Sequence, residues 1–445
     1  MRFVIPFILA ILILLSLRHV EFSQGYNNAV ELPVAGSIEE RPFFSTRRDP
    51  VINYDRQSND LVAQLSRKVE DGSVQLKFDK ASGYLLSVLD ALHVPIESQS
   101  VIFSKTSLQS HFISPANPRA LFYTDAVSVG FIRNATLLEI SVLDAQQGVL
   151  FYAIQQQPAG KPQIIRSDSC LSCHELHDTL DVPGLLARST GVGDEGQTMP
   201  DFGNFVTDHR SPLEERFGGW FITGKAGAAP HMGNIMHPAD AKPAPTGKSA
   251  DTPKMLVNLD GQFDPEGYPS RYSDIAAVMV LDHQVRMTNL LTRVGWESRI
   301  ALNQEEKNPG SRDTAERLIA SDIRELSDYM LFVDEAPLRG TFESTSGFQT
   351  KFESQGPNDS HGRSLRQLDL KKRLLRYPCS YMIYSAAFDD LPASVKNAVY
   401  ARLWDVLSGK DKSAKYSKLT TADRSAIVGI LLDTKKDLPA FFKPF

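Results

Sequence analysis

The sequence predicts an α+β fold with a small antiparallel β region, an irregular segment and a helical C-terminal region. Three patterns support this prediction: short β-rich runs separated by turn residues within 60–166, many Gly and Pro residues with few periods within 167–270, and helical periodicity within 271–445. The chain has 445 residues, of which 42% are hydrophobic and 23% are charged, so it can bury a sizeable core. A net charge of -5 without long basic blocks predicts no nucleic-acid partner.

The N-terminus is typical of an exported protein. Arg2 precedes an apolar run over residues 3–17, which has the length of a signal-peptide core and is shorter than the roughly 20 residues of a membrane span. No small-x-small cleavage site follows closely, so we interpret residues 1–20 as a signal peptide or an uncleaved N-terminal membrane anchor. The alternative is a buried N-terminal helix. Residues 21–59 are polar and interrupted by Pro and Gly, and we expect them to form a tether.

Residues 60–166 are expected to form a small α/β region with an antiparallel sheet. Helices are predicted at 61–69 and 84–93. Strands are predicted where β-branched and aromatic residues cluster, at 120–123, 127–132, 137–142 and 149–154. The residues between these runs, such as Thr124-Asp125, suit hairpin turns.

The helical region, 271–445, is expected to pack on the irregular segment that precedes it. Apolar stripes predict helices between 272 and 301 and around 319–333, and a further helix fits 393–407. The run Thr420-Thr421-Ala422-Asp423 has the pattern of a capping box and predicts the start of a last helix.

One short motif in the irregular segment indicates its chemistry. Cys170-Leu171-Ser172-Cys173-His174 matches C-x-x-C-H, the attachment motif for c-type haem. Two thiols with this spacing can form thioethers to the haem vinyl groups, and the adjacent imidazole becomes the proximal iron ligand. The alternatives are a redox dithiol or half of a zinc site, but the only other cysteine in the sequence is Cys379 and no second ligand pair is present. We therefore expect residues 167–270 to be a haem-binding segment that carries one covalent haem c, attached through Cys170 and Cys173 and with His174 as the proximal iron ligand.

The distal side of the iron has three candidate ligands. His231 and Met232 lie far enough beyond His174 for the chain to cross to the other haem face, and Gly233 next to them permits close backbone approach. His283 lies on the apolar stripe of a predicted helix, where a hydrogen-bonded core histidine is the competing interpretation. An open or water-bound iron is the remaining alternative. Candidates to pair with the haem propionates are Arg166, Arg188, Arg210 and Arg216.

These features predict an exported mono-haem c-type cytochrome that transfers single electrons to redox partner proteins in the cell envelope. The alternatives are a periplasmic haem enzyme, peroxidase-like or acting as a small-molecule oxidoreductase, and a haem-based sensor with an open sixth iron position. The expected location is the periplasm or cell envelope, with attachment to the inner membrane if residues 3–17 stay uncleaved.

The chain also resembles a largely uncharacterised group of exported bacterial proteins that carry a single cytochrome c motif. The stretches that carry the resemblance are FSKTSLQ near Phe103, SDSCLSCHE, TDHRSPLEERFGGWFITG, HMGN, SDIAAVMVLDHQVRMTNLLTR, YMLFVDEAPL, RYPCSYMIYSAAFDDLP and YARLWDVLSGKD. They run from about Val101 to the C-terminus, so the resemblance implies that β region, haem segment and helical region form one unit. It implies haem binding outside the cytoplasm, but neither a substrate nor a distal ligand. Bacterial di-haem peroxidases carry two C-x-x-C-H motifs, whereas this chain has one.

Overall fold

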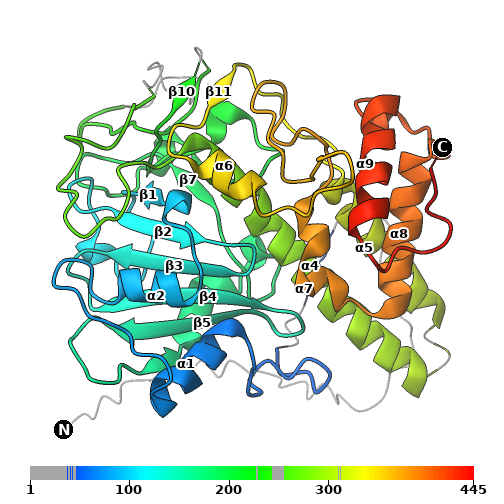
Figure 1. Ribbon diagram of the computed structural model, residues 1–445, viewed down its shortest axis with the longest axis horizontal. Helices are drawn as coiled ribbons and strands as arrows, with labels where there is room; N and C mark the ends of the chain where they lie inside the picture. Colours follow the sequence, from blue (N-terminus) through cyan, green and yellow to red (C-terminus); the bar gives the residue numbers. More distant parts are fainter. Residues whose placement is uncertain are drawn as a thin grey trace, which may run out of the picture.

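The computed structural model describes residues 47–226, 229–242, 255–308, 310 and 312–444, together with Ile38, Arg41 and Phe43. The expected signal peptide or anchor, residues 1–20, lies outside these residues. The α+β prediction is confirmed, because a seven-stranded antiparallel sheet is combined with helices that lie mostly towards the C-terminus (Figure 1). Within the described residues, no helix is both long enough and apolar enough to cross a bilayer.

The main sheet has the strand order β6-β5-β4-β3-β2-β1-β9, and every neighbouring pair is antiparallel. Its strands are β1 (Ser100–Ile102), β2 (Arg119–Tyr123), β3 (Val127–Ile132), β4 (Leu137–Asp144), β5 (Gly148–Gln155), β6 (Ile164–Arg166) and β9 (Trp220–Phe221). The four predicted strands correspond to β2–β5. The sequence did not reveal β1, β6 and β9, because runs of two or three residues are too short to show a period of two.

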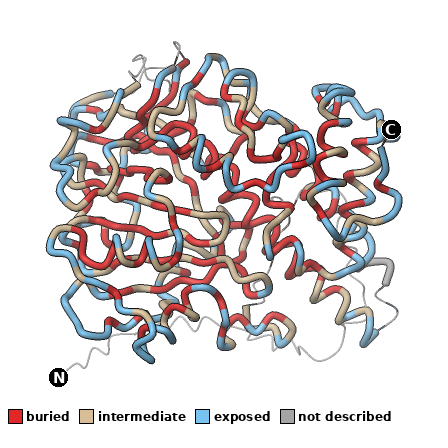
Figure 2. Tube along the Cα trace, in the orientation of Figure 1, coloured by how far each residue is buried: buried red, intermediate tan, exposed pale blue. Residues whose placement is uncertain are grey.

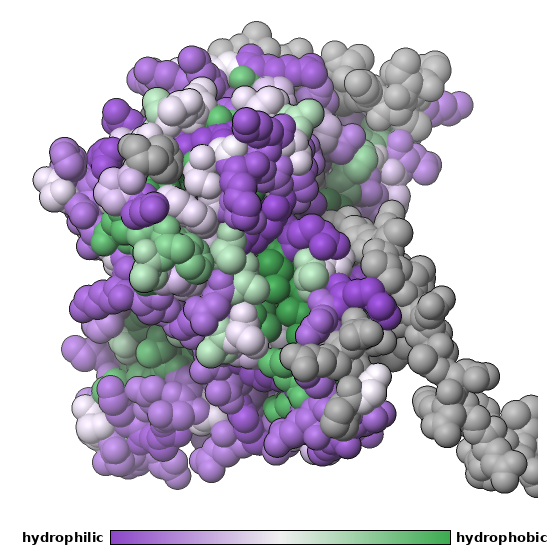
Figure 3. All heavy atoms as spheres, turned by 90° about the vertical axis from the view of Figure 1, so that its right-hand side faces the viewer, coloured by the Kyte–Doolittle hydropathy of each residue, from purple (hydrophilic) through white to green (hydrophobic). Residues whose placement is uncertain are grey.

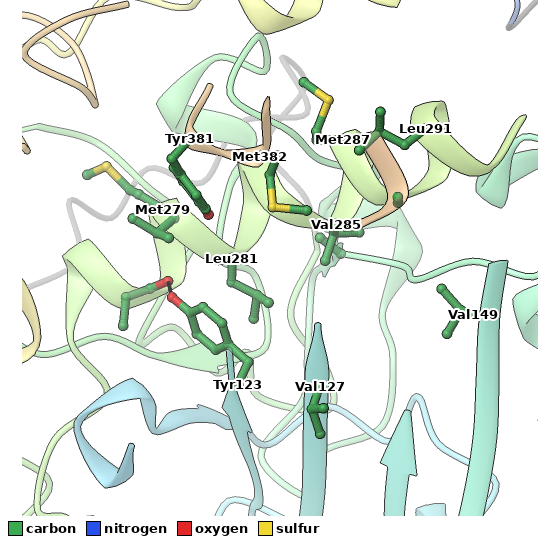
Figure 4. Close-up of a cluster of buried hydrophobic side chains, with 14 of the residues drawn as sticks. Tyr123, Val127, Val149, Met279, Leu281, Val285, Met287, Leu291, Tyr381 and Met382 are labelled. Atoms are coloured by element: carbon green, nitrogen blue, oxygen red, sulfur yellow. Dashed lines mark hydrogen bonds between the residues drawn. The ribbon is translucent and has the colours of Figure 1, made fainter. Parts of the chain in front are cut away.

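The two faces of the sheet are covered by different elements. Helices α1 (Leu61–Asp71) and α2 (Leu85–Ala91) lie against the face that carries the buried side chains of Phe122, Val129 and Ile140. On the opposite face runs α4 (Ile275–Lys307), and the Tyr123 hydroxyl donates a hydrogen bond of 2.5 Å to the Ala277 carbonyl of this helix. Figure 4 shows Leu281 and Val285 of α4 directed towards the strands that carry Tyr123 and Val127.

The C-terminal part is helical, as predicted. Its helices are α4, α5 (Arg312–Met330), α6 (Phe348–Glu353), α7 (Ala386–Asp389), α8 (Ala393–Leu407) and α9 (Thr421–Thr434). The predicted capping box is present, since Thr420 and Asp423 exchange hydrogen bonds at the start of α9. Helix α4 is buried along most of its length and lies at the centre of the molecule (Figure 2), whereas the side that carries α5, α8 and α9 is mainly hydrophilic with narrow hydrophobic strips (Figure 3).

The irregular segment is attached to both parts. It contains β7 (Arg188–Thr190), β8 (Asn204–Val206), β9 and β10 (Lys225–Ala226), which pairs with β11 (Phe342–Glu343) beyond α5. One continuous hydrophobic core extends from Ile38 to Phe442. Residues 47–59, within the expected tether, already belong to it: Ile52 and Tyr54 are buried, and the Tyr54 hydroxyl donates to the Val149 carbonyl at 2.8 Å.

Candidate haem site

The C-x-x-C-H motif forms a tight turn directly after the edge strand β6. Asp168–Cys170 is one turn of 3-10 helix, and Leu171–His174 continues it as the short α3. Leu171 is buried and anchors the turn, while Ser172 and Cys173 are exposed. Cys170 is half-buried, and burial raises the pKa of its thiol. Both thiols are free and lie within one helical turn of the imidazole.

The His174 imidazole is held in one orientation by the backbone. Its Nδ1 lies 2.9 Å from the Gly184 carbonyl oxygen, which can only accept, so Nδ1 carries the proton and Nε2 is the nitrogen with a free lone pair. Burial lowers the pKa of His174, which favours the neutral form that a metal requires. The ring centroid lies 4.9 Å from that of Phe151. A histidine whose second nitrogen donates to a carbonyl is the usual arrangement for a metal ligand.

Helix α4 fixes the loop that supplies this carbonyl. The Asn289 side chain accepts from the Leu185 N–H and donates to the Leu185 carbonyl, both at 2.8 Å. Gly184 is needed here, because a Cβ at this position would lie 2.4 Å from Asn289 Oδ1. The Gly184 N–H also donates to the His174 carbonyl at 2.9 Å, so imidazole, loop and α4 form one connected unit.

Cys170, Cys173 and His174 line a single cavity between the sheet and α4. The other lining residues are Thr106, Ser107, Leu108, Arg119, Leu121, Ser128, Gly130, Glu139, Ile140, Ser141, Phe151, Tyr152, Leu185, Leu186, Ala187, Trp220, Leu281 and Val285. Its volume of about 130 Å³ is smaller than the roughly 300–1,000 Å³ typical of small-molecule sites. A porphyrin would therefore fit only if flexible side chains of the lining moved aside.

Small side chains on the central strands form the floor of the cavity. Strand register places Gly130 of β3 between Leu121 of β2 and Glu139 of β4, and Ser128 opposite Ser141. These residues share one face of the sheet, since alternate residues of a strand point the same way. Gly and Ser leave a hollow where Leu or Phe would fill the space, so the sequence of the strands creates the cavity.

The cavity lining consists mostly of apolar side chains and side chains with a hydroxyl group, but it also includes one ion pair. Arg119 Nη2 lies 2.5 Å from Glu139 Oε2, and the two side chains meet over Gly130. Burial alone would raise the pKa of Glu139, but the Arg119 charge and hydrogen bonds from Gln109 and Ser107 lower it below its ordinary value. Arg119 lies close enough to His174 for its charge to lower the pKa of the imidazole further.

The three predicted distal-ligand candidates lie outside the cavity lining. His283 is fully buried, with Nδ1 2.8 Å from His209 Nδ1 and Nε2 2.8 Å from Ser380 Oγ, as in the competing interpretation of a hydrogen-bonded core histidine. His231 Nδ1 accepts from the Gly233 N–H at 3.0 Å.

Met232 is buried elsewhere, with its sulfur 3.7 Å from Ser189 Oγ. Among the described residues that line the cavity, His174 is the only histidine and no methionine is present.

The four arginines considered for the propionates also lie outside the cavity lining. Arg166 donates to the Tyr54 and Arg56 carbonyls, and Arg216 donates to the His209 and Ser211 carbonyls. Arg188 pairs with Asp178, and Arg210 pairs with Asp208.

Arg119 lines the cavity instead, and the sequence did contain a signal for it. Arg119, Glu139 and Ser141 are polar residues at alternating positions of otherwise apolar strands.

A second, more polar cavity adjoins the first. It has a volume of about 480 Å³ and shares Leu185 and Val285 with the first cavity, so these two side chains separate them. Asp208, Arg210 and Arg286 are among its charged lining residues.

Asp359, His361 and Asp433 form a separate cluster, whose ligand atoms lie within 4.8 Å of one another. Both carboxylates already have partners, since Asp359 pairs with Arg363 at 2.6 Å and Asp433 accepts from Ser360 Oγ at 2.6 Å.

No protein-family model, curated protein or solved structure matches the chain. The resemblance to exported single-motif haem proteins therefore stays a prediction.

Proposed function

We propose that the chain binds one haem c covalently through Cys170 and Cys173, with His174 as proximal iron ligand, and that a small molecule binds the iron on the opposite side. The observation that supports this most directly is the shared cavity, which both thiols and the imidazole line together. The fixed Nδ1–H of His174 supports it as well, because it leaves Nε2 available to a metal. Bound haem would supply a redox-active iron.

The residues of the cavity favour an open sixth position over a six-coordinate electron carrier. Among the described lining residues, His174 is the sole imidazole or thioether, so the far wall offers no side chain of the types that usually complete haem ligation. This favours a haem enzyme or sensor that acts on a small molecule. The polar cavity behind Leu185 and Val285 would give such a molecule a route towards the site.

Electron transfer is the second candidate, and a separate observation favours it. Cys173 and Ser172 are exposed, so a thioether-linked haem edge would lie at the surface, within reach of a redox partner protein. Either activity would fit the export to the periplasm or cell envelope that the N-terminus predicts.

Optical spectroscopy of the protein, produced in cells that attach c-type haem, tests the proposal. We expect a c-type pyridine haemochrome with one haem per chain, lost in Cys170→Ala/Cys173→Ala and kept in the control Cys379→Ala. A high-spin iron that binds carbon monoxide rapidly supports the open position. A low-spin iron with a methionine-to-iron band, abolished by Met232→Leu, would refute it in favour of the electron carrier, and so would a low-spin iron changed by His231→Ala or His283→Ala. Absence of covalent haem would refute the whole proposal.

A further inference from the structure

We propose that the Arg119 guanidinium is the oxyanion-binding group of this cavity, for a small carboxylate-like group on the distal side or edge of the haem. This inference rests on the proposed function. The group bound would be either a free small oxyanion that enters the cavity or a carboxylate of the haem itself. Both present the same chemistry, two oxygens that accept hydrogen bonds from a planar guanidinium.

Arg119 is held in place by Glu139, and at least one of its buried donors has no partner among the described residues. Its Nη2 donates to Glu139 Oε2 at 2.5 Å, and its Nε is buried without a hydrogen-bond partner among the described residues. A guanidinium has five N–H donors, so the pair with Glu139 uses a minority of them. A buried donor without a partner is uncommon in folded proteins. Arg41, Arg133 and Arg402 have one as well, but Arg119 differs from them because it lines the cavity.

Glu139 acts as the anchor of Arg119 rather than as a ligand group. Its Oε1 accepts from Gln109 Nε2 at 3.0 Å and from Ser107 Oγ at 3.4 Å, and its Oε2 accepts from Arg119. Gln109 is in turn fixed by the Leu137 N–H and carbonyl at 3.0 and 3.1 Å. The carboxylate is therefore largely saturated, whereas the Nε–H of Arg119 has no partner among the described residues.

Gly130 makes this arrangement possible. Arg119 and Glu139 come from β2 and β4 and reach each other across the intervening strand β3. A Cβ at Gly130 would lie 2.7 Å from Arg119 Nη2 and 3.2 Å from Glu139 Oε2, so any larger residue would displace the pair. The pair is about four-fifths buried, and both of its side chains line the cavity together with Cys170 and His174. A surface ion pair would need none of these features.

Nitrite is a suitable probe of the free-oxyanion source, because it has carboxylate-like oxygens and its binding to haem iron changes the optical spectrum. We expect Arg119→Gln to raise the apparent Kd for nitrite at least tenfold, which corresponds to about 1.4 kcal/mol. Arg119→Lys should lose less nitrite affinity than Arg119→Gln, because lysine keeps the positive charge but not the planar set of N–H donors of a guanidinium. The affinity for carbon monoxide, which carries no oxyanion, should change less than twofold in both variants.

Binding of a haem carboxylate by Arg119 would be detected by a different measurement. If Arg119 binds a propionate, Arg119→Gln should shift the propionate-bending band in the resonance Raman spectrum and leave the nitrite Kd unchanged. Gly130→Ala keeps the charge of Arg119 but displaces its guanidinium. It should therefore change the measurement that Arg119→Gln changes, the nitrite Kd or the propionate band, in the same direction.

The matched control is Arg133→Gln. Arg133 also pairs with a carboxylate at 2.5 Å, that of Asp264, and also has a buried Nε without a partner among the described residues, but it does not line the cavity. Unchanged nitrite binding and an unchanged propionate band in Arg119→Gln, in protein whose circular dichroism is native, would overturn the inference. If no c-type haemochrome forms, the proposed function fails and a haem carboxylate is excluded as the group that Arg119 binds. Calorimetric titration of the haem-free protein with nitrite then tests whether Arg119 binds a free oxyanion.

Discussion

Replacement of Asn289 by leucine should destabilise the protein through a loop that lies far from it in the sequence. The Asn289 side chain, 1% exposed, makes two hydrogen bonds of 2.8 Å to the backbone of Leu185. Leucine has a similar volume and no polar atom, so it would leave one N–H and one carbonyl without partners. An unsatisfied buried backbone group costs about 1–3 kcal/mol. Because Leu185 is only half-buried, we expect a total loss near the lower end, about 2–4 kcal/mol.

Urea unfolding of the haem-free protein, followed by circular dichroism, measures this loss. The control is Asn204→Leu: Asn204 is exposed and accepts from Arg188 at 3.1 Å, and its replacement should change the free energy of unfolding by less than about 0.5 kcal/mol. Equal losses of unfolding free energy in the two variants would refute the idea that Asn289 holds the loop around Leu185 to α4.

A double-mutant cycle with Gly184 tests the contact between loop and helix directly. Gly184→Ala would place its Cβ 2.4 Å from Asn289 Oδ1, and such overpacking costs about 1–3 kcal/mol. In an Asn289→Ala background this clash disappears, so Gly184→Ala should cost about 1 kcal/mol less there. Strict additivity of the two losses would show that the loop and α4 are not coupled.

Three further predictions concern the burial of single side chains. Burial raises the pKa of Asp282 to about 6, so the stability due to its protonated form is present below about pH 4 and is lost as the pH rises through 6. In urea unfolding, the free energy of unfolding of Asp282→Asn should equal that of the natural protein at pH 4 and exceed it by about 2–3 kcal/mol at pH 8. A difference that does not depend on pH would contradict this pKa. In haem-free protein, iodoacetamide should modify exposed Cys173 readily but Cys379, whose pKa burial raises to about 12, only in urea, as mass spectrometry of native and unfolded samples would show. Tyr123→Phe removes the hydroxyl that donates to the Ala277 carbonyl and should lower the free energy of unfolding by about 1 kcal/mol; no change would mean that the hydrogen bond adds nothing beyond solvation.

Local patterns in the sequence predicted the regular elements well. The helix predicted at 393–407 matches α8, and the capping box at Thr420 marks the start of α9. The strands β2–β5 were predicted because each has at least five residues and a turn next to it. The partners of β1 and β9 could not be predicted, because these strands are short and their pairing joins residues more than a hundred positions apart.

Only the C-x-x-C-H part of the candidate site could be named from the sequence. C-x-x-C-H is a local motif, so Cys170, Cys173 and His174 could be named from the sequence alone. The walls of the cavity come from β2–β5, from the loop around Leu185 and from α4, and no single segment contains their pattern. Among the distal-ligand candidates, His231 and Met232 were chosen by their spacing from His174, and His283 by its place on an apolar helical stripe. Neither pattern shows which cavity a side chain faces, and His283 points to Ser380 and His209.

The order of residues along α4 connects the C-x-x-C-H turn to the helical region. Leu281, Val285, Asn289 and Arg293 are spaced by four and form one stripe of the helix. The first two close the cavity, Asn289 holds Leu185, and fully buried Arg293 donates to the Leu180 carbonyl at 2.7 Å while Glu297 balances its charge. The same stripe therefore forms a wall of the cavity and positions the loop whose carbonyl orients His174. Because α4 is itself enclosed by α5 and α7, the helical region and the C-x-x-C-H turn are parts of one structural unit, and a change at their contact should alter the imidazole as well as the stability of the fold.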